Sequence, residues 1–265
     1  MHSSIITLLT DFGEGSGYPA QMKGVLWTLC PDARIVDLSH AVPAFRILVG
    51  QALLLETIPA FPPGTIHVAV VDPGVGTSQR GLVVQGGDKA PGQLLVGPDN
   101  GILWPFMRGG KAWELAEPAY RRAEVSATFH GRDVFAPAAA HLALGVPPER
   151  FGPEVLDPVQ LQAARVRHEG NAVVGEIVHV DSFGNLISNL SIEDLPPVPR
   201  GELKVAVGGR TLRGIQGTYA SVPQGALLVL VGSAGFVEIA VREGSAAREL
   251  KLEDGQGMPV VVEQA

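Results

Sequence analysis

The sequence predicts an α/β domain followed by a smaller antiparallel β domain, and three observations lead to this prediction. Through the first part of the chain, short apolar runs alternate with amphipathic stretches, a pattern typical of parallel strands joined by helices. After about Arg167, short apolar runs follow one another between Gly and Pro residues, as in antiparallel sheets. The chain has 265 residues, 46% apolar and 18% charged, which is enough for two unequal cores. We therefore expect domains over residues 1–167 and 168–265.

The first expected elements are a strand over residues 5–9 and a helix that ends at Pro31. A Gly-rich turn over residues 13–17 separates them, and Pro19 suits the first helical turn, where no N–H is needed. The apolar residues of this helix recur at helical spacing: Met22, Val25, Leu26 and Leu29.

The same alternation continues along the first domain. Strands are expected over residues 35–38, 65–71, 82–84 and 94–96, and helices over residues 47–58 and 133–144. Asp133 is well placed to cap the last of these helices. The pattern thus predicts a mainly parallel sheet with helices on both faces.

The second domain is expected to consist of short strands over residues 173–180, 203–207, 226–231 and 260–262. Gly208 and Gly209 stand between two of the apolar runs. They suit a two-residue hairpin turn, because both of its central residues need a positive φ.

Charge and composition favour a small-molecule partner. The net charge is -7 with only 20 Lys and Arg residues, whereas a nucleic-acid partner requires a dense basic face. The single Cys30 lies in an apolar helical run and is expected in the core, so that an intracellular, cytoplasmic protein is predicted. No basic leader and no apolar run of about 20 residues is present, so neither export nor membrane anchoring is expected.

Polar residues follow four of the expected strands: Asp11, Ser39–His40, Asp72 and Asp99–Asn100. Ligands of open parallel sheets bind beyond the carboxyl ends of the strands, so these residues are candidates for a site. The alternative is that they only shape turns, since Asp and Asn bond readily to nearby backbone. Similarly, Gly74 and Gly76 allow close approach of the backbone to a bound group or form a plain tight turn.

Three common kinds of site are disfavoured. Tyr18 stands where a dinucleotide fingerprint needs its third glycine, and residues 74–78 lack the Gly-Lys-Ser/Thr ending of a phosphate loop. Five of the seven histidines lie among many carboxylates but show no metal-ligand spacing, so no metal is expected: His40, His67, His130, His141 and His179. Among these, His130 is the best candidate for acid–base work, while the adjoining Arg132 and Asp133 are expected to be structural.

Seven segments, in this order along nearly the whole chain, resemble the S-adenosyl-L-methionine (SAM) hydroxide adenosyltransferase family, the adenosine-forming SAM hydrolases. They are residues 6–13, 30–37, 71–76, 98–101, 128–133, 181–185 and 232–235. The fluorinase and chlorinase are relatives of this family. The resemblance implies an N-terminal α/β domain, a C-terminal β-barrel, and a homotrimer that binds SAM between neighbouring subunits. It implies no cofactor, because SAM is the substrate.

By position, the resemblance implies that Asp11 holds the ribose hydroxyls and that Phe45 packs near the ligand. The remaining substrate-binding residues would be Gly131, Asp181, Phe183, Asn185 and Ser233.

The family's catalytic triad of Asp, Arg and His is matched by Asp72 and His130. In the family pattern the first of two basic residues after the Asp-Pro-Gly-Val-Gly-Thr stretch is the triad arginine, and this chain has Gln79 there. Either Arg80 serves instead after a small loop shift, or the triad is altered. We expect Arg80 to serve.

The resemblance predicts hydrolysis of SAM to adenosine and methionine, with water attacking the ribose C5′ in line with the carbon–sulfur bond. A halogenase is the alternative within this chemistry, but the Asp72 carboxylate would repel halide, and the stretch over residues 86–93 is short. A SAM or adenosine sensor without catalysis is the alternative from another class, and Gln79 is the reason to retain it.

Overall fold

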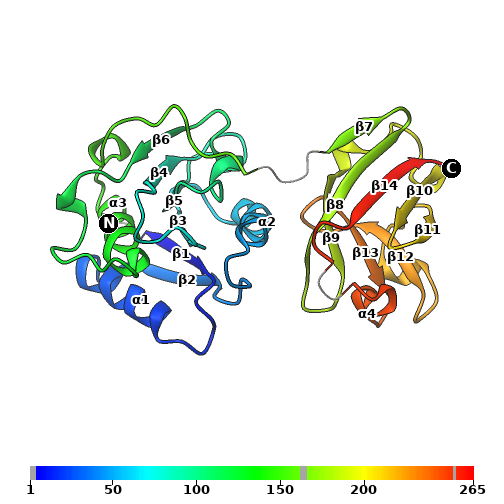
Figure 1. Ribbon diagram of the computed structural model, residues 1–265, viewed down its shortest axis with the longest axis horizontal. Helices are drawn as coiled ribbons and strands as arrows, with labels where there is room; N and C mark the ends of the chain where they lie inside the picture. Colours follow the sequence, from blue (N-terminus) through cyan, green and yellow to red (C-terminus); the bar gives the residue numbers. More distant parts are fainter. Residues whose placement is uncertain (1–3, 162–165, 253–254) are drawn as a thin grey trace. The chain divides into compact units, whose positions relative to one another are not determined.

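The computed structural model describes residues 4–161, 166–252 and 255–265, and the chain divides into two compact units, Met1–Leu161 and Gln162–Ala265 (Figure 1). The first unit contains a six-stranded sheet in the order β2-β1-β3-β5-β4-β6. Its strands are β1 (Ile5–Thr10), β2 (Arg34–Ser39), β3 (Ile66–Val70), β4 (Gly81–Gln85), β5 (Leu94–Pro98) and β6 (Lys111–Glu114). Its α-helices are α1 (Tyr18–Leu29), α2 (Ile47–Thr57) and α3 (Ala136–Ala143).

The sheet of the first unit is mixed and mainly parallel, as expected, with β4 as its reversed strand. β1 pairs in parallel with β2 and β3, and β3 with β5, whereas β4 is antiparallel to β5 and β6. The reason is the short connection over residues 86–93, because a parallel crossover needs a dozen or more residues. The sequence pattern did not predict β6.

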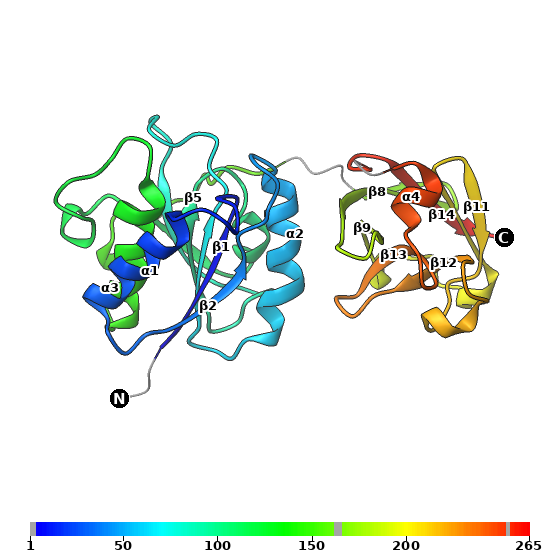
Figure 2. The same ribbon diagram turned by 90° about the horizontal axis from the view of Figure 1, so that it is seen from below.

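Helices cover both faces of this sheet, as expected. α1 and α3 lie on one face and α2 lies on the other (Figures 1 and 2). One buried cluster joins the sheet to Met22 and Leu26 of α1 and to Ala139 of α3. A second cluster joins the opposite face to Val49 and Leu54 of α2. β3 lies between these two cores and is buried at every residue, His67 included.

The helix expected over residues 133–144 does not begin at Asp133. A π-helical turn, η4 (Gly131–Phe135), precedes α3, and His130 occupies the N-cap position. Asp133 is therefore not the cap but lies fully buried inside the turn. Single π-helical turns are uncommon and are often found at functional sites.

The second unit is an antiparallel sheet in the order β11-β10-β14-β8-β9-β13-β12, with β7 beside β8. An isolated β-bridge joins Gln216, which follows β11, to Leu230 of β12. It links the two ends of this order, so the sheet is nearly closed and barrel-like. The elements are β7 (Arg167–Glu169), β8 (Ala172–Val180), β9 (Leu186–Ser191), β10 (Leu203–Val207), β11 (Arg210–Arg213), β12 (Leu227–Val231), β13 (Phe236–Val241), α4 (Ala246–Leu250) and β14 (Pro259–Gln264).

The predicted hairpin of this unit is confirmed. Gly208 and Gly209 have φ values of 54° and 74° and join β10 to β11. The strands β9 and β13 were missed, because polar residues such as Asn189 and Glu238 interrupt their apolar runs. Among the described residues, no helix has the length and apolar content that a membrane span requires.

Candidate functional site

Asp72 lies just beyond the carboxyl end of β3 and is half-buried. Its Oδ1 accepts hydrogen bonds from the backbone N–H of Gly74 at 3.2 Å and from Nε2 of Gln79 at 2.6 Å. Burial raises the pKa of the Asp72 carboxyl, and the charge of Asp11 raises it further. The hydrogen bonds from Gln79 and Gly74 and the charge of His130 act in the opposite direction, without cancelling the rise. Asp11 and His130 therefore lie close enough to Asp72 to affect its pKa.

Asp11 follows β1, whose carboxyl end lies beside that of β3, with Thr10 paired with Val70. Its Oδ2 accepts a hydrogen bond from the backbone N–H of Phe45 at 2.9 Å. Phe45 has a φ of 66°, a left-handed conformation that is costly for an aromatic residue. Its side chain is 69% exposed. Asp11 thus holds this exposed ring beside the sheet edge at which Asp72 lies.

The buried Asp133 of the π-helical turn is the centre of an ion cluster that adjoins His130. Asp133 accepts hydrogen bonds from Nη1 of Arg122 at 2.9 Å, from Nε of Arg132 at 2.7 Å, and from the backbone N–H of Ser126 at 2.9 Å. Although burial alone would raise the pKa of Asp133, these donors hold it at about 2. The carboxylate therefore stays ionised and ties the residues on both sides of His130 together. The structural roles expected for Arg132 and Asp133 agree with this arrangement.

An aromatic cluster packs against the same turn. The rings of Phe12, Tyr18 and Phe129 meet edge to face, with centroids 5.1 to 5.7 Å apart. A Cβ on Gly131 would lie 3.2 Å from the Phe12 ring and 3.3 Å from the sulfur of Met22. The absence of a side chain at Gly131 thus brings the turn close to β1 and α1.

Arg80 lies elsewhere than its predicted role requires. Its guanidinium pairs with the buried Asp99 at 2.7 Å and with Asp157 at 2.9 Å. Gln79, rather than Arg80, donates to Asp72. These two neighbouring residues thus have different partners.

Several of the polar residues at strand ends are engaged with the protein itself. The amide of Asn100 donates to the carbonyl of Val71 at 2.8 Å, and Nδ1 of His40 pairs with Oγ1 of Thr10 at 2.9 Å. Together with Asp99, which Arg80 holds, these residues favour the turn-shaping alternative. Sequence reasoning could not separate them from Asp11 and Asp72, because all of them follow apolar runs.

In the second unit, Asp181 and Asn185 form a tight turn. Oδ1 of Asp181 accepts from the backbone N–H groups of Phe183 and Asn185 at 2.9 and 2.8 Å, and Oδ2 accepts from Nδ2 of Asn185 at 2.9 Å. The turn leaves the side chain of Phe183 77% exposed. Two of the predicted binding residues thus hold a third in an exposed position.

Tyr219 and Glu238 adjoin this turn and were not predicted. Oη of Tyr219 donates to Oε2 of Glu238 at 3.3 Å. Burial raises the pKa of both side chains, and the charge of Asp181 raises both further. The Glu238 carboxylate lies over Gly232, the residue before the predicted Ser233. No motif in the sequence pointed to this pair, because Glu238 stands within an ordinary strand.

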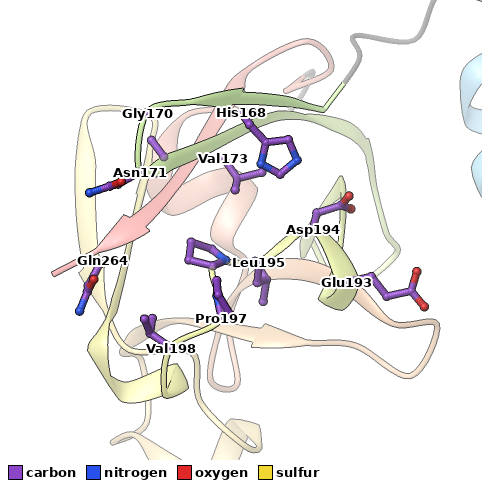
Figure 3. Close-up of a pocket in the computed structure, with 12 residues that line it drawn as sticks. His168, Gly170, Asn171, Val173, Glu193, Asp194, Leu195, Pro197, Val198 and Gln264 are labelled. Carbon is purple, nitrogen blue, oxygen red and sulfur yellow. The ribbon is translucent and has the colours of Figure 1, made fainter.

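The second unit also has an open hollow of about 410 Å³ (Figure 3). Its polar lining includes His168, Glu193 and Asp194, and its apolar lining includes Val173 and Leu195. None of the predicted site residues lines it. Among the residues that the structure describes, no group of three or more His, Cys, Asp or Glu side chains could hold a metal ion.

The chain has two compact units, and the Asp72 carboxylate lies close to the His130 imidazole at the carboxyl end of β3 in the first of them. Residues 6–152 match the N-terminal domain of SAM hydroxide adenosyltransferase, and residues 175–258 match its C-terminal domain. The chain belongs to the SAM hydroxide adenosyltransferase family.

Relatives agree with this assignment. An (R)-S-adenosyl-L-methionine hydrolase of Salinispora arenicola is 42% identical, over 96% of this chain and 97% of its own. A fluorinase of Nocardia brasiliensis is 25% identical over 97% of both chains. The crystal structure of an uncharacterized conserved protein from Thermotoga maritima superposes with a TM-score of 0.89 and 34% identity, over 98% of this chain and 100% of its own.

Proposed function

We propose that this protein hydrolyses SAM to adenosine and L-methionine by in-line attack of water on the ribose C5′. The proposal rests on the Asp72 carboxylate, which lies close to His130 at the carboxyl end of β3 in a chain 42% identical to a named SAM hydrolase. A carboxylate and an imidazole together can orient a water molecule and accept its proton.

The chemistry demands little beyond this pair. The leaving group departs from a sulfonium as a neutral thioether, so no general acid is required. Holding the water in line with the carbon–sulfur bond can supply roughly 7 kcal/mol or more of the acceleration. A pocket that excludes water also disfavours the localised sulfonium charge relative to the transition state. No cofactor has a role in this reaction.

We propose the remaining contacts residue by residue. Asp11 would accept hydrogen bonds from the ribose hydroxyls, and Phe45 would cover the ligand. Gly131 would let the nucleoside approach the turn after His130. Asp181, Phe183, Asn185 and Ser233 would hold the methionine and adenine parts. The exposure of Phe45 and Phe183 supports these roles, because large exposed aromatic side chains are typical of binding surfaces.

The substrate we propose is the (R) form at sulfur, because the Salinispora arenicola relative is an (R)-S-adenosyl-L-methionine hydrolase. The sulfonium is pyramidal, so its two configurations present the methionine chain in different directions relative to C5′. In-line attack suits only the configuration that the site positions.

Hydrolysis has two alternatives. Halogenation is disfavoured because the Asp72 carboxylate repels halide at the place where a nucleophile must stand. A noncatalytic sensor is the second candidate, since Gln79 supplies no positive charge to Asp72.

Purified protein is incubated separately with each SAM epimer in ¹⁸O-labelled water, and products are followed by chromatography and mass spectrometry. Hydrolysis predicts adenosine labelled at the 5′ hydroxyl together with methionine, faster from the (R) epimer. Unlabelled adenosine would exclude attack at C5′, and stoichiometric binding without turnover would establish the sensor.

We propose further that the protein is a homotrimer with SAM bound between neighbouring subunits. This oligomer is implied by the family resemblance. Light scattering is expected to give three times the chain mass of 27.8 kDa.

A further inference from the structure

The two carboxylate oxygens of Asp72 differ in the hydrogen bonds they accept. Both of its hydrogen-bond donors, the Gly74 backbone and the Gln79 amide, reach the same oxygen, Oδ1. Among the residues that the structure describes, none donates to Oδ2. One oxygen is thus fixed while the other keeps its full capacity to accept a proton.

The conformation of the loop from Asp72 to Gln79 places the Gln79 amide beside Asp72. Oγ1 of Thr77 donates to the carbonyl of Gly74 at 2.7 Å and accepts from the backbone N–H of Gln79 at 3.2 Å. A Cβ on Gly74 would lie 2.4 Å from Oε1 of Gln79. Gly74 therefore leaves the space that the Gln79 side chain occupies.

We propose that Gln79 is a positioning residue for the hydrolysis, and that its neutral amide fixes Oδ1 of Asp72 so that Oδ2 faces the nucleophilic water. This inference rests on the proposed function. In the step it serves, a water O–H bond breaks and its proton moves to Oδ2. Meanwhile the oxygen–C5′ bond forms, and the C5′–sulfur bond breaks with its electron pair going to sulfur.

The choice of an amide has an electrostatic consequence. The charged groups that face Asp72 are His130 and Asp11, while Arg80 is engaged by Asp99 and Asp157. Gln79 orients the carboxylate without the strong lowering of the pKa that a guanidinium would bring. A carboxylate whose pKa stays raised is a stronger base once ionised.

The first test replaces the amide. Gln79→Leu removes the donor at similar size, and we expect kcat to fall about 10-fold to 100-fold, as for loss of a hydrogen bond to a charged group, with KM within about twofold. The acidic limb of the kcat/KM profile should move to higher pH, since a donor to the ionised form is lost. Gln79→Arg should move the same limb to lower pH.

Gly74→Ala provides an independent variant that keeps Asp72, Gln79 and the Gly74 backbone donor. Its Cβ displaces the amide, so its kcat and pH profile should resemble those of Gln79→Leu. The neighbouring Ser78 is exposed, and Ser78→Ala is the matched control, expected to leave both unchanged.

The two proposals fail in different ways. If the wild type hydrolyses SAM but Gln79→Leu and Gly74→Ala retain its kcat and acidic limb, the role of Gln79 is wrong and the function stands. If the wild type hydrolyses neither epimer, the function is wrong. The contact is then judged by ¹³C NMR titration of the Asp72 carboxyl. A higher pKa in Gln79→Leu and a lower one in Gln79→Arg support it, and an unchanged pKa overturns it.

Discussion

The first domain contains two carboxyl groups, Asp72 and Asp133, whose pKa values are shifted in opposite directions. Asp72 receives two donors on one oxygen and has a raised pKa, whereas Asp133 is fully buried among Arg122, Arg132 and a backbone N–H and has a pKa of about 2. Asp133 is stabilised as an ion, and Asp72 is held ready to take up a proton. Perturbed pKa values occur both in structural ion-pair networks, such as that of Asp133, and at functional sites, where we place Asp72.

Asp72→Asn should therefore abolish hydrolysis while raising stability. The folded pKa of Asp72 is above its ordinary value of 3.8, so its contribution to stability is fully present below that pH and is lost as pH rises through the folded pKa. At pH 7 the wild type bears this cost and the amide does not. Urea unfolding at pH 7 and at pH 4 should show a gain for the variant that shrinks at the lower pH. An inactive variant that is less stable at pH 7 would contradict this account.

Asp133→Asn should act in the opposite sense and destabilise the first domain by about 3 kcal/mol at pH 7, because it leaves two arginines without their anion. The folded pKa is lowered, so the stabilising contribution is present above about pH 4 and is lost as pH falls through about 2. Urea unfolding is measured from pH 7 down to pH 2. Equal stability of the two proteins at pH 7 would show that the ion cluster contributes nothing.

At the scale of the element, the site depends on two loops that approach each other closely. Gly76, in the loop after β3, has a φ of 79°, and a Cβ there would lie 2.3 Å from the carbonyl oxygen of Ala127, which precedes His130. This approach sets the loop of Asp72 against the segment that carries His130. Only glycine meets both requirements, the left-handed backbone and the space.

Gly76→Ala should therefore lower kcat more than its loss of stability explains, because backbone cannot move aside as a side chain can. Gly64→Ala is the matched control, since Gly64 has a φ of 84° but nothing within 4 Å of the Cβ position. We expect both variants to lose about 1 kcal/mol from the left-handed backbone and Gly76→Ala to lose more through the clash, and we expect only Gly76→Ala to lose about 10-fold or more in kcat. Thermal unfolding and the SAM assay are measured on both. Equal kcat values for the two variants would remove the loop contact from the mechanism.

What the sequence could predict follows from the range of each interaction. The alternation of apolar runs is local, so it revealed β1 to β5 and the α-helices of the first domain, and the two glycines revealed the Gly208–Gly209 hairpin. The burial of Asp133 and the partners of Arg80 depend on residues farther apart in the chain. Asp72 and His130 could be singled out by position, but the contact of Gln79 required the loop geometry.

At the scale of the whole molecule, the proposed trimer makes a prediction about mixing. If each SAM site uses the N-terminal domain of one subunit and the C-terminal domain of a neighbour, two inactive variants can complement each other. Asp72→Asn is defective in the first domain, and Asp181→Ala disrupts the exposed turn in the second. Denatured and refolded together in equal amounts, they should recover about a quarter of the wild-type rate, because both intact halves meet at a quarter of randomly assembled sites. Each variant refolded alone is the control. A mixture as inactive as its components, in trimers confirmed by light scattering, would place each site within a single chain.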